Sequence, residues 1–206
     1  MITLIDYKAG NLTSVRKAFA YLGVESEVTD DPERVRDAQA LVLPGVGHFC
    51  TTERLATSGV RDAVREAIGR GTPFLGICVG MQWQFAGSTE SPETAGLGLF
   101  EGACERFQTS LKVPHVGWNQ IGRTQEGAES RLLEGVPDES FVYFTHSYRA
   151  PVVAGVAAVT SYGETFAACV ERENVFGTQF HPEKSGDMGL RMLKNFCDYA
   201  AERRAR

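Results

Sequence analysis

One cysteine lies in a setting that could make it reactive. The segment Gly76-Ile77-Cys78-Val79-Gly80 has the G-x-nucleophile-x-G form of a nucleophile elbow, between a strand-like run and the helix-like residues MQWQF. The turn is so tight that side chains at the two glycine positions would collide with neighbouring elements. The amino end of a helix favours thiolate over thiol. We therefore expect Cys78 to be a nucleophile; a buried core cysteine in a Gly-rich turn is the alternative.

A base for this nucleophile is offered near the end of the chain. The run Val175 to Phe180 is apolar and ends at His181, with Glu183 two residues later. A cysteine nucleophile needs a base, and the base needs a group that fixes its tautomer and orientation. His181 and Glu183 fit these two roles.

The loop Pro44-Gly45-Val46-Gly47 could supply the third part of an acyl-transfer site. It follows an apolar run, Ala40 to Leu43, and its glycines let backbone amides turn toward an oxyanion without steric cost. We expect Val46 and Gly47 to contribute such amides, with the amide of Val79 as a further donor. A turn that binds nothing is the alternative.

The remaining histidines and cysteines predict no metal or cofactor site. We expect His48 to be exposed, and His115 and His146, in strand-like runs, to be satisfied polar residues. No pair has metal-ligand spacing. Five cysteines at irregular spacings predict no disulfide framework, and the four besides Cys78 are expected to be small hydrophobes in apolar settings.

The elements that must position these residues form an α/β pattern. In the first half, short apolar runs alternate with helical patterns, which is typical of a parallel sheet covered by helices. The expected strands there are 2–6, 24–29, 40–43 and 73–77, and the expected helices start near Thr13, Asp31 and Val60.

From about Gly96 the pattern becomes strand after strand, with a terminal helix. The expected strands are 103–107, 115–121, 141–150, 156–161, 167–171 and 175–180, the last two joined by a hairpin turn. We predict a single α/β domain over residues 1–206: an open, largely parallel sheet flanked by helices, with an antiparallel appendage.

Composition narrows the class of protein. The chain has 206 residues, 43% of them hydrophobic, and 21 Lys+Arg against 26 Asp+Glu give a net charge of −5. No basic face suited to nucleic acid or an anionic membrane is indicated. The longest apolar run, 151–159, is about half of what a membrane span needs. We expect a cytoplasmic globular protein.

Five motifs together resemble a known family. GICVGMQ, PGVG, KVPHVGWNQ, YFTHSY and FHPEKSG, in this order, resemble the class I, triad-type glutamine amidotransferases. Within that class they are most similar to the glutaminase subunits of imidazole glycerol phosphate synthase. The resemblance covers the chain from Ile2 to about Arg203, and it implies a flavodoxin-like fold.

The resemblance implies a reaction and a partner. Cys78 would attack the side-chain amide of glutamine, His181 would relay protons, and Glu183 would orient His181. The ammonia would pass to a (β/α)8-barrel cyclase subunit, in a heterodimer that makes imidazole glycerol phosphate and an aminoimidazole carboxamide ribotide for histidine biosynthesis.

The resemblance also implies roles for other positions. Substrate would be held by Gln82, Thr145, His146, Ser147 and Tyr148, and the partner-facing side would be lined by Asp6, Tyr7, Asn11, Trp118, Asn119, Tyr143 and Lys184. The PGVG loop would hold the Val46 amide in a non-productive orientation, and this amide would flip toward the oxyanion when the partner is occupied.

The chain departs from the family pattern at three places, and other functions stay open. Lys8 stands where a glycine is usual, Trp83-Gln84 where two leucines are common, and Phe49-Cys50 where Ala-Phe is common. One alternative is the glutaminase subunit of an anthranilate, pyridoxal phosphate or carbamoyl phosphate synthase, although those more often carry a P-G-G loop. The other is a non-catalytic module on the same fold, which a broken triad would favour.

Overall fold

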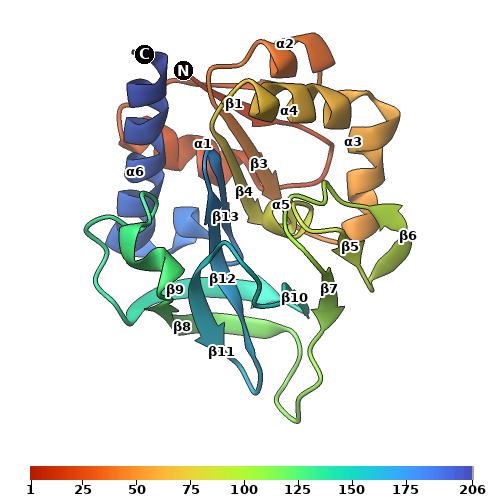
Figure 1. Ribbon diagram of the computed structural model, residues 1–206, viewed down its shortest axis with the longest axis vertical. Coiled ribbons are helices and arrows are strands. Elements are labelled where there is room, and N and C mark those ends of the chain that lie inside the picture. The colour runs from red at the N-terminus through yellow and green to blue at the C-terminus, as the bar shows by residue number, and fades with distance from the viewer. Residues whose placement is uncertain (206) are drawn as a thin grey trace.

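Two β-sheets organise the chain in the computed structural model, which describes residues 1–205 (Figure 1). The larger sheet contains β1 (Ile2–Ile5), β2 (Ser26–Thr29), β3 (Leu41–Gly45), β4 (Phe74–Cys78), β8 (His115–Arg123), β9 (Ser140–His146), β11 (Val156–Ser161), β12 (Thr165–Arg172) and β13 (Val175–Thr178). Its nine strands lie in the order β2-β1-β3-β4-β13-β12-β11-β8-β9. The first five in this order are parallel, and each later strand is antiparallel to the one before it. The fold class predicted from the sequence is confirmed.

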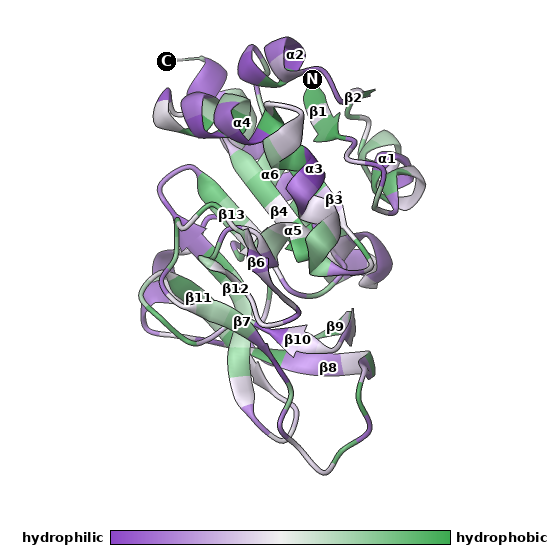
Figure 2. Ribbon diagram, turned by 90° about the vertical axis from the view of Figure 1, so that its right-hand side faces the viewer, coloured by the Kyte–Doolittle hydropathy of each residue, from purple (hydrophilic) through white to green (hydrophobic). Residues whose placement is uncertain are grey.

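Helices cover both faces of the parallel part. They are α1 (Leu12–Tyr21), α2 (Pro32–Arg36), α3 (Glu53–Thr57), α4 (Val60–Gly69), α5 (Val79–Gln82) and α6 (Gly186–Arg204), with 3₁₀ turns η1 (Phe49–Thr52), η2 (Glu126–Glu129) and η3 (Pro182–Lys184). Helix α1 packs beside α6, and α2 packs beside α4. The central strands are hydrophobic, whereas the helices carry hydrophilic residues as well (Figure 2).

Local sequence explains where the helices start. Asp31 caps α2 by accepting a hydrogen bond from the amide of Glu33, and Pro32 occupies the first turn, where a missing N–H costs nothing. Asn11 caps α1 through the amide of Ser14. Both expected helix starts are within a residue or two of those observed.

A second, smaller sheet beside the carboxyl ends of the parallel strands corresponds to the expected appendage, although of its four strands only Ala103–Arg106 matches an expected strand. It contains β5 (Gly87–Ser88), β6 (Ser91–Ala95), β7 (Ala103–Arg106) and β10 (Tyr148–Arg149) in the order β10-β7-β5-β6. The strand expected over 141–150 is therefore wrong as a single element: β9 ends at His146, and the chain then switches sheets into β10. Ser147, between the two, lies at the edge of a cavity.

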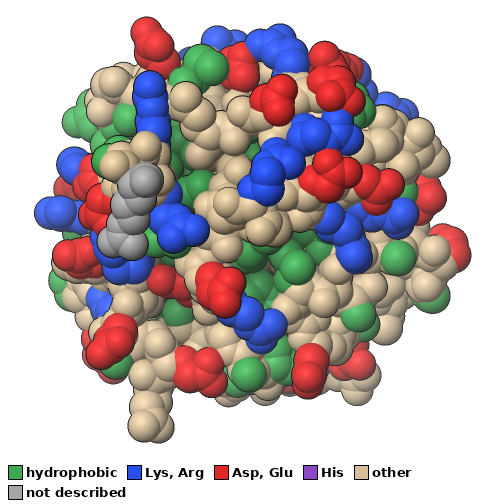
Figure 3. Space-filling view, turned by 45° about the horizontal axis from the view of Figure 1, so that its top comes forward, with side chains coloured by type: hydrophobic (Ala, Val, Ile, Leu, Met, Phe, Trp, Pro, Cys, Tyr) green, Lys and Arg blue, Asp and Glu red, His purple; other side chains and the backbone are tan. Residues whose placement is uncertain are grey.

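One face of the molecule carries side chains of both charges. Figure 3 shows a face on which Lys and Arg side chains alternate with Asp and Glu. No helix within residues 1–205 has the length and apolar character needed to cross a bilayer.

Cys104 and Cys169 are buried as expected, but Cys50 is exposed, so the apolar setting predicted for it is wrong. Cys50 lies in the short turn η1, just after the glycine-containing loop.

Candidate active site

Cys78 occupies a strained turn between β4 and α5. Its backbone has φ 54° and ψ −109°, a left-handed region that L side chains rarely adopt. Such strain costs about 1–3 kcal/mol and persists only where the surrounding structure enforces it. The helix that follows is shorter than expected, four residues, so the thiol lies at the start of a single helical turn.

The two glycines of the elbow are sterically required. A Cβ at Gly76 would lie 2.3 Å from the carbonyl oxygen of Gly80, and a Cβ at Gly80 would lie 1.9 Å from that of Leu43. Both contacts are with backbone, which cannot move aside as a flexible side chain can. The collision predicted from the sequence spacing is confirmed. Because the two glycines have no side chain, β3 and α5 can approach each other closely enough to form the elbow.

His181 reaches the same edge of the sheet because β13 runs parallel to β4. Thr178 is the register partner of Ile77, so the residues that follow both strands emerge side by side. The chain then turns through η3, where Nδ1 of His181 lies 2.8 Å from Oε1 of Glu183. Both side chains are buried. A carboxylate can only accept, so Nδ1 carries the hydrogen and Nε2 is the atom left for chemistry.

The charges of this group favour a protonated imidazole. Burial lowers the pKa of His181, but its interactions with the Cys78 sulfur and the Glu183 carboxylate outweigh burial and raise the pKa to about 10. Within residues 1–205, Nε2 makes no hydrogen bond of standard geometry. The imidazolium is therefore stabilised by the Glu183 carboxylate on one side and, once the thiol has lost its proton, by the Cys78 sulfur on the other.

A backbone clamp holds the histidine against β9. The amide of His181 donates to the carbonyl oxygen of Tyr143 at 2.9 Å, and the amide of Tyr143 donates to the Ser185 hydroxyl at 3.0 Å. The same hydroxyl donates to the carbonyl oxygen of His181 at 2.6 Å. This closed set of bonds fixes the imidazole relative to the last strand of the large sheet.

A cavity of about 260 Å³ opens beside the thiol, and most of the predicted site residues meet there. It is lined by Val46, Gly47, Cys78, Val79, Gln82, Glu90, Pro114, Thr145, His146, Ser147 and Tyr148. All the residues expected to form an oxyanion hole or to hold substrate are in this set. Glu90 was not foreseen, since it lies in a polar loop without a motif. It is the only charged side chain in the lining, and its carboxylate accepts the amide of Phe49 at 2.7 Å.

Two neutral histidines lie at the wall of the cavity: His146 lines it, and His115 contacts His146. Nδ1 of His146 lies 2.8 Å from the carbonyl oxygen of Tyr148, which can only accept, so His146 carries its hydrogen on Nδ1. Its Nε2 then accepts from Nδ1 of His115 at 3.2 Å. Burial lowers the pKa of His115 to about 4 and that of His146 to about 3. Both are satisfied polar residues, as predicted, and the ring of His146 has no nitrogen left for a ligand.

Gln179 is a second residue that the sequence reasoning missed. Its side chain is fully buried directly before Phe180 and His181, and its Nε2 lies 3.7 Å from the Cys78 sulfur. Within an apolar run it looked like one more strand residue. The signal that could have found it is a polar side chain in a run otherwise suited to a buried strand.

The residues expected to face a partner fall into two groups. Trp118 and Tyr143 are register partners on β8 and β9 with ring centroids 6.1 Å apart, and the ammonium of Lys184 lies 5.9 Å from the Tyr143 ring. Trp118 is 55% exposed. Asn119 points to the other side of β8 and donates to the carbonyl oxygen of Ser161.

The second group lies in the loop between β1 and α1. Asp6 is partly exposed and Asn11 caps α1, but Tyr7 is only 4% exposed, because it packs beneath the loop that starts at Gly45. Tyr7 therefore exposes little of its side chain, although it lines a surface hollow with Asp6 and Lys8, and its partner-facing role stays a prediction. Its hydroxyl finds no hydrogen-bond partner in the described chain, and burial raises its pKa.

Lys8 replaces the usual glycine without changing the backbone that glycine suits. Its φ is +64°, in the left-handed region. Its ammonium compensates by pairing with the carboxylates of Asp6 at 2.9 Å and Asp30 at 3.0 Å. The three charged groups tie the β1–α1 loop to the end of β2.

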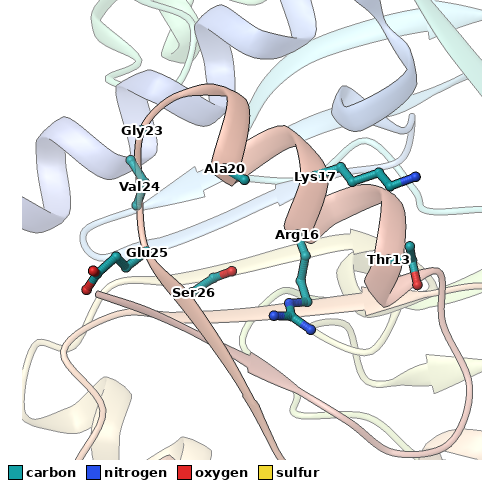
Figure 4. Close-up of a pocket in the computed structure, with 8 residues that line it drawn as sticks. All are labelled: Thr13, Arg16, Lys17, Ala20, Gly23, Val24, Glu25 and Ser26. Atoms are coloured by element: carbon teal, nitrogen blue, oxygen red, sulfur yellow. The ribbon is translucent and has the colours of Figure 1, made fainter.

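A larger hollow, about 510 Å³, lies between α1 and β2, away from these residues (Figure 4). Arg16 and Lys17 belong to its lining, but their side chains project from α1 in different directions. Its lining holds neither a cysteine nor a histidine, and its polar side chains do not converge on one point, so the smaller cavity beside Cys78 is the candidate active site.

Comparisons with known proteins identify the family of this chain. The profile of the family described as "Glutamine amidotransferase class-I" matches residues 3–199. "Imidazole glycerol phosphate synthase subunit HisH" of Moorella thermoacetica is 46% identical, over 95% of this chain and 93% of the relative, and the protein of that name from Herpetosiphon aurantiacus is 47% identical, over 98% and 96%.

Solved structures agree on the fold. A chain described as "Crystal structure of glutamine amidotransferase" superposes with a TM-score of 0.76 at 21% identity, over 98% of this chain and all of the other. A chain of PurLQS from Thermotoga maritima superposes with a TM-score of 0.73 at 18% identity, over 96% and 97%. The chain thus belongs to the class I glutamine amidotransferase family and, within it, to the HisH subunits of imidazole glycerol phosphate synthase.

Proposed function

We propose that this chain is the glutaminase subunit of imidazole glycerol phosphate synthase: it hydrolyses glutamine to glutamate and ammonia and supplies the ammonia to a (β/α)8-barrel cyclase in histidine biosynthesis, in the cytoplasm. The observation that carries the proposal is the buried Cys78, His181 and Glu183 arrangement on a strained elbow, in a chain of this family. The named relatives do not favour another synthase, and the intact triad does not favour a non-catalytic module.

In the first half of the reaction Cys78 acts as the nucleophile. Its sulfur attacks the side-chain carbonyl carbon of glutamine, a C–S bond forms, and the amide oxygen becomes an oxyanion. The backbone amides of Val46, Gly47 and Val79 are the proposed donors to that oxygen. His181 then gives the proton on Nε2 to the departing nitrogen, which leaves as ammonia.

In the second half, water replaces ammonia. His181, now neutral at Nε2, accepts a proton from a water molecule that attacks the thioester carbonyl. The C–S bond breaks, the sulfur leaves as thiolate, and glutamate is released. Glu183 acts throughout by holding Nδ1–H at 2.8 Å, so that Nε2 keeps facing the reacting atoms.

The cavity suggests how glutamine is held. We propose that the Glu90 carboxylate, the only charged group in the lining, binds the substrate ammonium. Thr145, Ser147 and Tyr148 line the same cavity and present backbone and hydroxyl groups for the carboxylate. Gln82 and His146 contribute indirectly, because their nitrogens are engaged within the protein.

The aromatic face of β8 and β9 is the proposed cyclase surface. Val116, Trp118, Phe141 and Tyr143 project to the same side, and the first three are more than half exposed. Beside them lies Lys184, and Tyr143 is bonded through its backbone to His181. A partner seated on this face would thus contact the strand that holds the base. Asp6 and Asn11 would extend the surface.

The triad is tested in the complex with the cyclase. Cys78→Ser is expected to abolish glutamine-dependent formation of imidazole glycerol phosphate, because serine is a poor nucleophile without strong activation. Synthesis from added ammonium salts should survive, since the cyclase is unchanged. Glutamine-dependent activity that persisted in this variant would rule out Cys78 as the nucleophile.

The partner surface is tested by a binding measurement. Trp118→Ala is expected to weaken cyclase binding by about 2 kcal/mol, the usual loss for a central aromatic residue of an interface. Val152→Ala is the matched control, because Val152 is similarly exposed, at 51%, but lies outside the aromatic face. Equal effects of the two substitutions in titration calorimetry would place the interface elsewhere.

A further inference from the structure

We propose that Gln179 is a further catalytic residue, whose side-chain amide donates a hydrogen bond to the Cys78 sulfur and stabilises its thiolate. The inference rests on the proposed function only in taking Cys78 as the nucleophile. It starts from a contact that the triad does not use: Nε2 of Gln179 lies 3.7 Å from Sγ of Cys78. Gln179 is fully buried, so water does not compete for this bond.

The direction of this hydrogen bond follows from a series of hydrogen bonds that begins at the backbone carbonyl oxygen of Tyr148. The Tyr148 carbonyl oxygen can only accept, and the Gln82 side-chain amide lies 2.9 Å from it, so that atom of Gln82 is the nitrogen. The same nitrogen lies 3.0 Å from a side-chain atom of Gln179, which must therefore be its oxygen. The NH₂ group of Gln179 is then the group that faces the sulfur.

The Tyr148 carbonyl oxygen, at which this series of hydrogen bonds begins, is itself held in place. The Tyr148 carbonyl oxygen also accepts from Nδ1 of His146, whose other nitrogen is bonded to His115. Neither amide can rotate by half a turn without placing two acceptors or two donors against each other. The side chain of Gln179 is thus held with its donor toward Cys78 before substrate arrives, which is the preorganisation that electrostatic catalysis requires.

A donor at this position acts when the sulfur is charged. Hydrogen bonds to ionised groups are about twice as strong as those between neutral groups, so the bond favours thiolate over thiol. When the sulfur attacks, its negative charge passes to the substrate oxygen and the bond weakens. When the thioester is hydrolysed, the C–S bond breaks, its electron pair returns to sulfur, and the Gln179 amide again stabilises the departing thiolate.

A purely structural role would require only the side-chain oxygen of Gln179. The oxygen of Gln179 supports Gln82, and through it the substrate cavity. If that were its whole task, replacing Gln179 would raise KM and leave the intrinsic reactivity of Cys78 unchanged. If the amide nitrogen stabilises the thiolate, the reactivity of Cys78 falls even in the absence of glutamine.

The test measures thiol reactivity without substrate. Gln179→Met keeps the length of the side chain but removes the donor, and Gln84→Met is the matched control. Gln84 is also fully buried, yet its Nε2 bonds to the Phe176 carbonyl oxygen rather than to sulfur. Iodoacetamide alkylation at neutral pH is followed by mass spectrometry of the Cys78 peptide. The exposed Cys50 serves as an internal reference within each molecule.

We expect Gln179→Met to slow the alkylation of Cys78 about tenfold, as for loss of a hydrogen bond to a charged group. Cys50 should react at the wild-type rate in every variant, and Gln84→Met should leave Cys78 unaffected. In the cyclase complex, kcat for glutamine should fall by a similar factor. Alkylation of Cys78 within twofold of wild type, or a change in KM alone, would overturn the proposal.

A second measurement needs no substitution at Gln179. The side-chain amide proton resonances of Gln179 in the otherwise native protein should shift upfield in Cys78→Ala, whereas those of Gln84 should stay in place. Unchanged Gln179 resonances would overturn the proposal even if Gln179→Met did not fold. Because the alkylation rate and the amide resonances are both measured without glutamine, a lack of glutaminase activity in the native complex would count against the proposed function and not against this contact.

Discussion

The strain at the nucleophile can be measured by comparing Cys78→Gly with Cys78→Ala. Both substitutions remove the thiol, so they differ only in the cost of the backbone and of one methyl group. At φ 54° and ψ −109°, glycine relieves about 1–3 kcal/mol of strain. Against this stand about 0.5–1 kcal/mol for the greater freedom of glycine in the unfolded chain and about 0.8 kcal/mol for the lost methyl group.

We expect the glycine variant at position 78 to be more stable than the alanine variant, which reverses the usual order at a buried position. With the strain in the middle of its range, about 2 kcal/mol, Cys78→Gly should be roughly 0.5 kcal/mol more stable than Cys78→Ala, since the relief of strain then exceeds the other two costs together. Cys104 is the control: it is fully buried in β7 and lies outside the set of residues with positive φ. There, Cys104→Gly should be less stable than Cys104→Ala by about 1.5 kcal/mol.

The assay is urea unfolding of the four variants, with the free energy of unfolding obtained by linear extrapolation and the slopes compared to exclude a change in the unfolded state. The quantity that decides is the difference between the two glycine-for-alanine effects, expected to be about 2 kcal/mol. Equal losses at positions 78 and 104 would refute the reasoning, because they would mean that the elbow stores no strain.

Three further predictions follow from contacts described above. Gly80→Ala should destabilise the fold by about 3 kcal/mol or more, because its Cβ would meet the Leu43 backbone, whereas Gly122→Ala, with open space around its Cβ, should be nearly neutral in calorimetry. Lys8→Ala should lower the melting temperature, since the strain stays and the ion pairs are lost, but Lys8→Gly should not; equal losses would contradict the role given to φ +64°. The raised pKa of His181 should stabilise the fold fully below about pH 6.5, with this contribution lost as pH rises toward 10. The difference in unfolding free energy between wild type and His181→Gln should accordingly shrink over that range, and a constant difference would exclude the coupling.

The sequence predicts those parts of the site that local rules determine. The elbow was visible because its glycines are demanded by a turn of five residues, and the His181 and Glu183 pair because it follows an apolar strand directly. The α/β order followed from the alternation of apolar runs and helical periods. Each of these signals lies within about 20 residues of chain.

The parts that were missed depend on long-range packing. Gln179 gains its meaning only when β13 lies beside β4 and brings its amide to the sulfur, about a hundred residues away in sequence. The buried position of Tyr7 depends on the loop after β3, and the break at Ser147 on a second sheet. Segment 91–95, with a proline and no alternating apolar residues, carries no strand signal of its own.

The clamp between His181, Ser185 and Tyr143 has a consequence for aggregation. Strand β9 is the last of the large sheet, and an open strand edge invites pairing with another chain. At Tyr143 that edge is already occupied, by the segment that carries the base. A substitution that loosened this segment would therefore release a free strand edge beside exposed aromatic side chains. Loss of activity by this route should be accompanied by loss of solubility, so selection for catalysis also protects the subunit from self-association.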